Sequence, residues 1–306
     1  MAKETNNEKQ DFTMELTAQA FRQLNRLQLN AGRYLPGHSV GMRPSLRRRP
    51  SSEFKEHRMY VTGDDMRFVD WKASSRSEHV FVKLGEQPKE ATVYILLDCS
   101  RSMGWGEPPK SNTALALAAA ISYLALSQGD RLMIIPFSEQ IIQPLGPISG
   151  KGQFPGMINY LKDIKCSGAT NFSETVHTFK RTLALYGGLT FIISDLLDVD
   201  DLESALEIMP APGWEVAVFQ VLHPEELDPQ ARGNFEMEDC ESGLIMNYDL
   251  NAEAVKTYKQ RINDWQKQID LVCVEQNALY TMIPTDWTLE REIISHIRDI
   301  QVVNPL

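Results

Sequence analysis

The sequence has few cysteines, and none of them are paired in a recognisable motif. Its 306 residues include four, Cys99, Cys166, Cys240 and Cys273, which are far apart and form no Cys-x-x-Cys. Zinc ribbons and disulfide frameworks need closely spaced or more numerous cysteines. The sequence therefore argues against both classes, and we expect small buried cysteines in a reducing compartment.

Long apolar runs and common catalytic motifs are also missing. No segment approaches the roughly 18 consecutive apolar residues of a membrane span, and the polar first ten residues lack the apolar centre of a signal peptide. The six histidines form no His-x-x-x-His, and there is no P-loop and no Gly-x-Ser-x-Gly. We therefore expect a cytoplasmic protein with no membrane span, and neither a zinc hydrolase nor a P-loop nucleotidase.

The charge is negative overall but unevenly distributed. The net charge is -10, yet residues 1–60 carry 11 Lys and Arg against 6 Asp and Glu, so the remaining 246 residues carry 20 against 35. The acidic total argues against nucleic acid as a partner. The basic run at Arg43 and Arg47–Arg49 fits a solvated turn or a contact with an anion or a partner, and both interpretations stay open.

Strands and helices alternate along most of the chain, and 42% of the residues are hydrophobic, enough for a real core. This alternation predicts an α/β fold with a doubly wound, mostly parallel sheet. We predict strands at 80–84, 92–98, 132–137, 189–194, 214–222 and 279–283, a short edge strand at 140–143, and a hairpin from 234–238 and 243–248. We predict helices at 12–29, 114–126, 152–161, 172–185 with its cap at Asn171, 200–208, 252–276 and 289–298.

Three segments follow from this pattern. Residues 1–89 would form an N-terminal arm with a helix, the basic loop and a short β element. Residues 90–225 would hold the main α/β domain, and residues 226–306 would complete the same fold with a hairpin and helices.

The sequence Asp98-Cys99-Ser100-Arg101-Ser102 directly follows the apolar strand 92–97. It places one carboxylate and two hydroxyls on a tight loop at the carboxyl end of a strand, where open α/β sheets bind ligands. Oxygen donors of this kind suit a hard divalent cation, so we predict a site for Mg²⁺ or Mn²⁺, with Ca²⁺ also open.

Two further oxygen donors fit the same site. Thr170 lies in a loop of small residues before a helix, and Asp195 ends the apolar strand 189–194. If the strands ending at Asp98 and Asp195 are close, all three loops meet at one edge of the sheet. The alternative is that Asp98, Ser100 and Ser102 only cap the next helix. We expect that helix to start near Ser111, beyond Pro108-Pro109, and therefore favour the metal.

The pattern Asp-x-Ser-x-Ser, then a loop Thr, then a strand-ending Asp resembles the metal-ion-dependent adhesion site of von Willebrand factor A domains over residues 90–225. The resemblance implies that Ser100 and Ser102 coordinate the cation directly and that Thr170 does so directly or through water. It implies that Asp98 and Asp195 coordinate directly or accept hydrogen bonds from metal-bound waters. One position would stay open for the carboxylate of a partner protein.

A second resemblance covers most of the chain. The motif Tyr60-x-x-Gly63-Asp64-Asp65-x-Arg67-x-x-Asp70-Trp71-x-Ala73-x-x-Arg76, followed by Asp-x-Ser-x-Ser, is similar to the bacterial domain-of-unknown-function 58 family. We interpret the motif as a brace that fastens the arm to the main domain through Trp71, with partner docking as the alternative. Many relatives carry N-terminal membrane helices; this sequence shows no such helix, so we do not expect direct membrane anchoring.

These resemblances imply a function. Relatives accompany MoxR-type AAA+ ATPases and other A-domain proteins, so we expect a non-enzymatic adaptor that binds a partner carboxylate through its cation, in chaperone-like maturation or a stress response. The alternative is an enzyme whose Mg²⁺ acts as a Lewis acid on a phosphate or carbonyl. That enzyme would need a general base or a phosphate clamp, and Arg43 and Arg47–Arg49 are candidates for the clamp.

Overall fold

The computed structural model of the chain describes residues 17–29, 56–61, 66, 69–77, 79–84, 91–184, 187–197, 199–211, 213–230, 233–238 and 245–305. The chain forms two compact units, one of residues 1–35 and 91–306 and the other of residues 36–90. The tail at 1–10, the basic run at 43–49 and, within the Gly63–Arg76 motif, residues 63–65, 67 and 68 lie outside the described residues.

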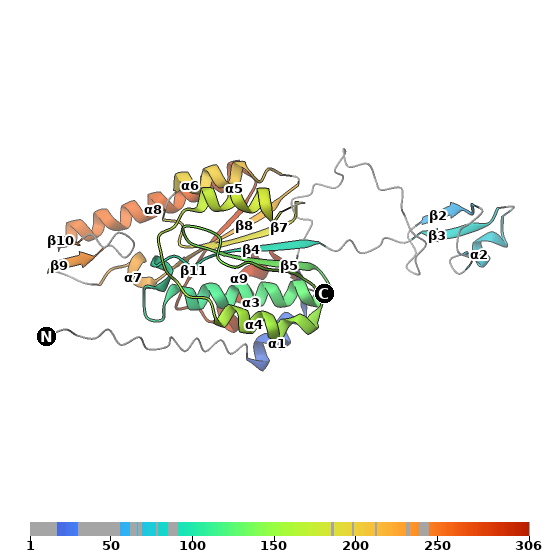
Figure 1. Ribbon diagram of the computed structural model, residues 1–306, viewed down its shortest axis with the longest axis horizontal. Coiled ribbons are helices and arrows are strands. Elements are labelled where there is room, and N and C mark those ends of the chain that lie inside the picture. The colour runs from blue at the N-terminus through green and yellow to red at the C-terminus, as the bar shows by residue number, and fades with distance from the viewer. Residues whose placement is uncertain are drawn as a thin grey trace. The chain divides into compact units, whose positions relative to one another are not determined.

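A six-stranded sheet forms the centre of the larger unit (Figure 1). The strand order is β11-β8-β7-β4-β5-β6, and every neighbouring pair is parallel except β5 and β6. The strands are β4 (Thr92–Asp98), β5 (Arg131–Phe137), β6 (Leu145–Ile148), β7 (Leu189–Ser194), β8 (Glu215–Leu222) and β11 (Leu279–Pro284). The predicted α/β fold with a mostly parallel sheet is confirmed.

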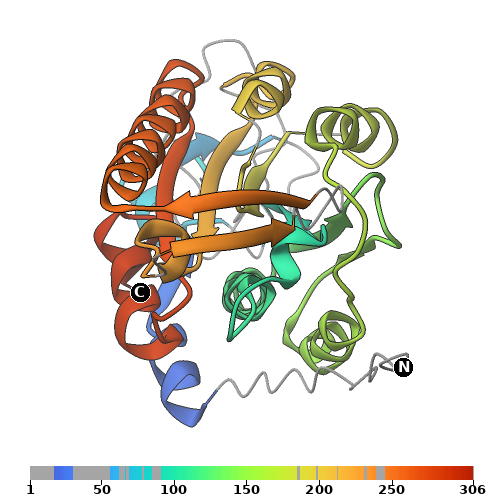
Figure 2. The same cartoon turned by 90° about the vertical axis from the view of Figure 1, so that its left-hand side faces the viewer.

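Helices cover both faces of this sheet, as Figure 2 shows. The helices of the larger unit are α1 (Ala18–Leu24), α3 (Lys110–Gln128), α4 (Phe154–Lys162), α5 (Phe172–Thr182), α6 (Val199–Glu207), α7 (Pro224–Leu227), α8 (Ala252–Glu275) and α9 (Ile294–Asp299). Strand β4 shows the alternation: Val93, Ile95 and Leu97 pack with α1, α3, α4 and α9, while Tyr94 and Leu96 pack with α5, α6 and α8. Strands covered on both faces read as continuous apolar runs, which is why their positions were predictable.

Helix α3 is buried on nearly all sides, as its apolar composition predicted. It lies between the sheet and the outer helices α1 and α4. It begins at Lys110, one residue before the start expected near Ser111 and four before the apolar stretch 114–126, because Pro109 takes the extended conformation of an N-cap and the helix follows at once.

The predicted helix at 12–29 is wrong at its carboxyl end. Thr17 caps α1 by accepting from the backbone N–H of Ala20, and the helix ends at Leu24. Residues 27–29 instead form β1 (Leu27–Leu29), which pairs antiparallel with β12 (Val303–Pro305). The buried, exposed, buried pattern of these residues belongs to a strand, but it is too short to stand out against the helical spacing before it.

The predicted edge strand at 140–143 is also misplaced. Only Ile141 makes a bridge there, to Phe137, and Gln143 has a φ of 33° that breaks an extended chain. The strand that pairs antiparallel with β5 is β6, which starts at Leu145, five residues after the predicted start. At Gly146 an added Cβ would lie 2.5 Å from the carbonyl oxygen of Leu132, so the close approach of these strands requires glycine.

The C-terminal segment matches its prediction in most elements. Strands β9 (Gly233–Glu238) and β10 (Ile245–Leu250) form the predicted antiparallel hairpin, and α8 follows within a residue of its expected bounds. The closing helix begins with a π-helical turn at Leu289–Ile293 before α9. Cys99 and Cys273 are buried as expected, Cys166 is half-buried, and Cys240 lies outside the described residues.

The smaller unit contains β2 (Glu56–Met59) paired antiparallel with β3 (Phe81–Leu84), and the short helix α2 (Trp71–Ser74). Asp70 caps α2 by accepting from the backbone N–H groups of Lys72 and Ala73, both at 3.1 Å. The Trp71 side chain is 60% exposed. The brace between arm and main domain stays a prediction.

The order of the strands places a topological switch point beside β4. The chain leaves β4 into α3, which covers one face of the sheet, and leaves β7 into α6, which covers the other. Because the two connections diverge, the carboxyl ends of β4 and β7 mark the crevice position at which open α/β sheets usually bind ligands. Asp98 and Asp195 stand at these two strand ends.

Candidate metal centre

Asp98 is the last residue of β4 and its side chain is buried. The backbone N–H of Ser100 donates to its Oδ1 at 2.8 Å, and the hydroxyl of Ser194 donates to its Oδ2 at 2.5 Å. Both carboxylate oxygens therefore have a fixed direction, and each keeps a lone pair for another partner.

The hydroxyls of Ser100 and Ser102 face each other inside the same loop, with their Oγ atoms 2.9 Å apart. Both side chains are buried. Adjacent ligands of an octahedral Mg²⁺ at 2.0–2.1 Å are also about 2.9 Å apart. The distance thus matches both a hydrogen bond between hydroxyls and one edge of a magnesium coordination shell.

The capping alternative does not account for these oxygens. The N-cap of α3 is Pro109, and no side chain makes a capping hydrogen bond there. The 3-10 turn at Ser102–Gly104 has no side-chain cap either. The carboxylate of Asp98 holds its own loop through Ser100.

Thr170 is brought to the site through its loop. The backbone N–H of Ser167 donates to Cys99 O at 2.8 Å, and that of Arg101 donates to Gly168 O at 2.9 Å. These two bonds fasten the loop that carries Thr170 against the loop that carries Ser100, and Thr170 itself is half-buried. The helix that follows is capped by Asn171, as predicted.

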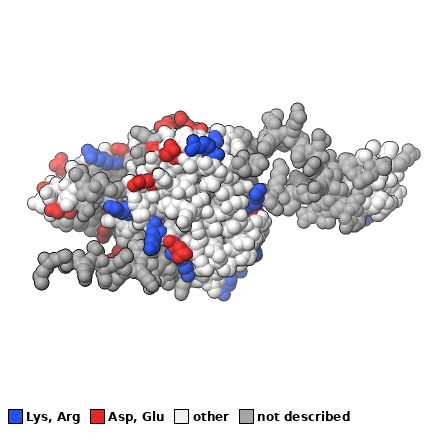
Figure 3. All heavy atoms as spheres, in the orientation of Figure 1, with Lys and Arg blue, Asp and Glu red and all other residues white. Residues whose placement is uncertain are grey.

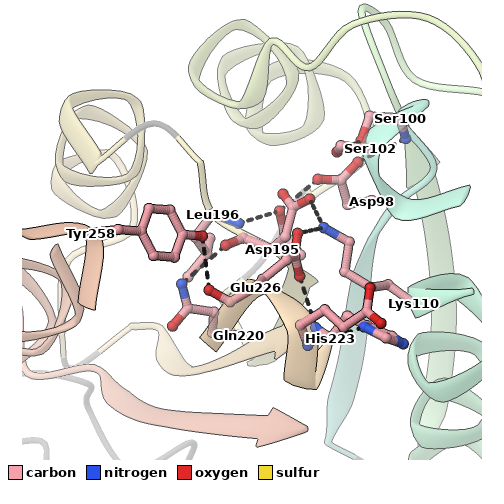
Figure 4. A network of polar contacts seen from close by, with 12 residues as sticks. Asp98, Ser100, Ser102, Lys110, Asp195, Leu196, Gln220, His223, Glu226 and Tyr258 are labelled. Carbon is pink, nitrogen blue, oxygen red and sulfur yellow. Dashed lines mark hydrogen bonds and ion pairs between the residues drawn. The ribbon is translucent and has the colours of Figure 1, made fainter. Parts of the chain in front are cut away.

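Asp195 is buried directly after β7, and its neighbour Ser194 joins the two halves of the site by donating to Asp98. Its backbone carbonyl accepts from Gln220 Nε2 at 3.0 Å, and Gln220 in turn accepts from the Tyr280 hydroxyl at 2.6 Å. Hydrogen bonds thus connect the ends of β4 and β7 with Gln220 inside β8 and Tyr280 inside β11. Figure 4 shows Asp98, Asp195 and Gln220 in this network.

Lys110 is the residue that sequence reasoning missed. It is 1% exposed, and its ammonium donates to Asp195 Oδ2 at 2.8 Å and to Glu226 Oε1 at 2.7 Å. Its position offered one signal: a lysine in the first turn of a helix opposes the helix dipole and needs a compensating carboxylate. Glu226 gave no such signal, because acidic residues are common in the first turn of a helix such as α7.

Glu226 ties this ion pair to the N-cap of its own helix α7 and to α8. Its Oε2 accepts from the backbone N–H of His223 at 2.7 Å, and its backbone carbonyl accepts from the Tyr258 hydroxyl at 2.8 Å. The His223 ring packs edge-on against Trp105, whose side chain is 41% exposed, with centroids 5.3 Å apart. Trp105 therefore packs on one side and faces solvent on the other.

The electrostatics leave an excess of negative charge. Burial, followed by the nearby Asp195, raises the pKa of Asp98 to about 7. Burial alone would lower the pKa of Lys110, but Asp195 and Glu226 outweigh it and raise that pKa above its ordinary value. With all three carboxylates ionised, the four groups sum to -2.

The donor set fits a hard divalent cation. Two hydroxyls and the carboxylates converge at the crevice, and a charge of +2 would balance the cluster. Among the described residues no three His, Cys, Asp or Glu side chains are placed to hold a metal. Coordination here would therefore depend on the hydroxyls of Ser100 and Ser102.

Charged side chains are interspersed around this unit. Figure 3 shows both signs mixed over the described part of the face in view. Leu197, just after Asp195, is 57% exposed, so apolar surface also lies near the crevice.

Two solved structures resemble the chain. BatB from Bacteroides thetaiotaomicron is 19% identical with a TM-score of 0.43, and the match covers 69% of this chain and 98% of BatB. An aerotolerance-related membrane protein from Bacteroides fragilis is 17% identical with a TM-score of 0.43, covering 68% of this chain and 97% of that protein.

The membrane description of the Bacteroides fragilis protein contradicts our cytoplasmic prediction, which is withdrawn. That prediction rested on the missing apolar span, and a missing span does not determine location. Within the described residues, no helix is long and apolar enough to cross a membrane.

Relatives by sequence are themselves uncharacterized. Proteins of Mycobacterium bovis and Mycobacterium tuberculosis are each 26% identical over 222 residues, which is 71% of this chain and 68% of theirs. The family described as "Protein of unknown function DUF58" matches residues 56–268, from β2 into α8. Because this match spans more than two thirds of the sequence and includes the whole candidate centre, the chain belongs to the DUF58 family.

Proposed function

We propose that this chain is a non-enzymatic protein-interaction module of the von Willebrand factor A type, which binds a partner carboxylate through a divalent cation. The observation that supports this most strongly is the convergence of Asp98, Ser100, Ser102 and Asp195, with the loop of Thr170, at the crevice between β4 and β7. These are hard oxygen donors on short, mutually hydrogen-bonded loops, which is what Mg²⁺ or Mn²⁺ binding needs.

Protein donors already use one lone pair on each of three carboxylate oxygens at the centre. The Oδ2 atom of Asp195 is bound to Lys110, and both oxygens of Asp98 accept hydrogen bonds. Coordination positions that these oxygens and the hydroxyls of Ser100 and Ser102 do not fill would accept an anionic ligand from outside. A glutamate or aspartate of a partner protein supplies such a ligand.

Exposed apolar side chains near the crevice favour a protein as that partner. Trp105 and Leu197 follow the two strand ends that carry Asp98 and Asp195, and they are 41% and 57% exposed. Tryptophan is enriched at the centres of protein interfaces. By family resemblance, we propose a MoxR-type AAA+ ATPase or another A-domain protein as the partner.

A direct test compares cation and partner binding in one set of variants. Wild type, Asp98→Asn, Ser100→Ala and the exposed control Ser149→Ala are titrated with Mn²⁺, and free Mn²⁺ is followed by electron paramagnetic resonance. We expect wild type and Ser149→Ala to bind one Mn²⁺, and the other two to bind at least ~10-fold more weakly, because each loses an oxygen donor or its charge.

The same four proteins then serve as baits for affinity capture, each in Mg²⁺ and in EDTA. The proposal predicts an AAA+ ATPase or A-domain protein that is retained by wild type in Mg²⁺ and released by EDTA. Capture that is equal in EDTA, or with Asp98→Asn, would contradict a metal-bridged contact. Metal-dependent hydrolysis of phosphoesters by wild type would favour the enzymatic alternative instead.

A further inference from the structure

The buried ammonium of Lys110 lies within the candidate centre, where a cation is unexpected on local grounds. Lys110 is the first residue of α3, and the N-terminus of a helix carries partial positive charge. Its side chain is 1% exposed, so water does not screen the unfavourable interaction. A lysine in this place has to be stabilised by anionic partners.

Two carboxylates supply that stabilisation, and they come from separate parts of the fold. Asp195 follows β7 and lies 2.8 Å from the ammonium, while Glu226 belongs to α7 and lies 2.7 Å away. Removing one member of such a buried group leaves an uncompensated charge and is strongly destabilising. The ion pairs therefore hold the crevice together without any metal.

The same contacts set the charge available to a metal. Asp98, Asp195 and Glu226 contribute -3 when ionised, and Lys110 reduces this to -2. Lys110 also occupies Oδ2 of Asp195, the carboxylate that the family pattern assigns to the cation. An ammonium and a metal ion next to the same carboxylate repel each other and compete for its oxygens.

We propose that Lys110 is the resident cation of this centre: it keeps the crevice folded when no metal is bound and weakens metal binding by competing for Asp195. This inference rests on the proposed function for its metal half. Its other half, the stability of the metal-free protein, stands on the ion pairs alone.

The proposal predicts that substitutions at the two contacting residues Lys110 and Glu226 change cation affinity in opposite directions. Lys110→Met keeps most of the side-chain volume and removes the charge, leaving -3 at the centre. Glu226→Gln removes one negative charge and leaves Lys110 on Asp195, giving -1. Lys110→Met should therefore bind a cation more tightly than wild type, and Glu226→Gln more weakly.

The test titrates Mn²⁺ into wild type, Lys110→Met, Glu226→Gln and the exposed control Lys151→Met, and follows free Mn²⁺ by electron paramagnetic resonance. We expect affinity to rise roughly 10-fold or more in Lys110→Met, because an uncompensated neighbouring charge interacts strongly in a buried site. Glu226→Gln should bind several-fold more weakly, and Lys151→Met should match wild type.

Thermal unfolding of the same proteins in EDTA and in Mn²⁺ supplies the second readout. Lys110→Met should have a lower Tm than wild type in EDTA, and Mn²⁺ should raise its Tm more than that of wild type.

If wild type binds Mn²⁺ and Lys110→Met binds no more tightly, or is equally stable in EDTA, the inference is wrong while the proposed function survives. If no protein in the set binds Mn²⁺, the proposed function fails, and with it the competition. Should Lys110→Met not fold, an affinity in Glu226→Gln equal to or above that of wild type would still overturn the inference.

Discussion

At the scale of single residues, the centre depends on a serine that lies outside the Asp-x-Ser-x-Ser pattern. Ser194 donates to Asp98 Oδ2 at 2.5 Å and accepts from the backbone N–H of Leu196 at 3.0 Å. It therefore fixes the carboxylate of β4 to the end of β7. Residues that orient metal ligands in this way affect affinity without touching the metal.

Ser194→Ala should weaken Mn²⁺ binding about 10-fold, since outer-shell partners contribute roughly 10- to 100-fold to metal affinity. The measurement is the Mn²⁺ titration described above, together with the Tm in EDTA. Ser122→Ala is the matched control: that hydroxyl is equally buried, in α3, and has no hydrogen-bond partner among the described residues. Equal Mn²⁺ affinity in both variants would show that Ser194 does not position Asp98.

A second residue-scale prediction concerns the opposite end of the sheet. Glu215 begins β8 with a buried side chain, and its Oε2 accepts no hydrogen bond from the described residues. Burial raises the pKa of this carboxyl above its ordinary value. The folded state thus binds its proton more tightly than the unfolded state, and this group costs stability as the pH rises through the folded pKa.

Glu215→Gln removes that cost and should raise the Tm at pH 7. The gain should shrink as the pH falls and disappear below about pH 4, where the carboxyl is protonated in both states. Thermal unfolding of the two proteins between pH 4 and pH 8 measures the difference. A gain that does not change with pH would rule out the desolvated charge as its cause.

The residues of the centre were predictable to different degrees. Asp98, Ser100 and Ser102 could be found because they follow an apolar strand at fixed spacing, and Asp195 because it ends another. Lys110 and Glu226 could not be paired, because they are 116 residues apart and meet only through the fold. Local pattern identifies donors on one loop, whereas the counter-ion of a buried carboxylate is determined by tertiary packing.

At the scale of elements, the entry into β7 requires glycine for a steric reason. A Cβ on Gly188 would lie 2.3 Å from the carbonyl oxygen of Thr92, at the start of the neighbouring strand β4. Gly156, within α4, has open space around the same position. The two glycines therefore give opposite expectations for the same substitution.

Gly188→Ala should destabilise the protein by about 1–3 kcal/mol, because the paired strands β4 and β7 must separate to admit the methyl group. Gly156→Ala should stabilise it by up to ~1 kcal/mol through helix propensity. Chemical denaturation, fitted with one m-value for all variants, measures both changes in the free energy of unfolding. Stability unchanged by Gly188→Ala would mean that the strands part without cost.

Elements were predictable where their own residues carry the signal. Strands β4, β7 and β8 are continuous apolar runs, and α8 has a polar N-cap at Asn251 followed by 24 helical residues. Strand β6 is an edge strand that pairs only with β5 and has no fully buried residue, and β12 is three residues long. Such short strands form because they pair with a neighbouring strand. The residues that determine their position therefore lie in another part of the chain.

At the scale of the whole larger unit, the two ends of its sequence are joined. Strands β1 and β12 pair antiparallel, with Leu29 opposite Val303, and both side chains are buried in the core on the α3 face of the sheet. Helices α1 and α9 lie on that face as well. Residues about 270 positions apart thus close one side of the core, a contact of high loop-closure cost.

This closure predicts strong coupling between the two ends. Leu29→Ala should cost about 2–5 kcal/mol and Val303→Ala about 1–3 kcal/mol, since both remove buried apolar groups. The loss of unfolding free energy in the double variant should be smaller than the sum of the two single losses by about 0.5–3 kcal/mol. Once the first substitution weakens the pairing of β1 with β12, the second removes fewer stabilising contacts. The stability losses of Leu29→Ala and of Val176→Ala, which lies in the core on the other face, should instead add.

Equilibrium denaturation of the five variants supplies both double-mutant cycles. Additivity in the first cycle would mean that β1 and β12 contribute separately, and that the larger unit does not depend on the joining of its ends.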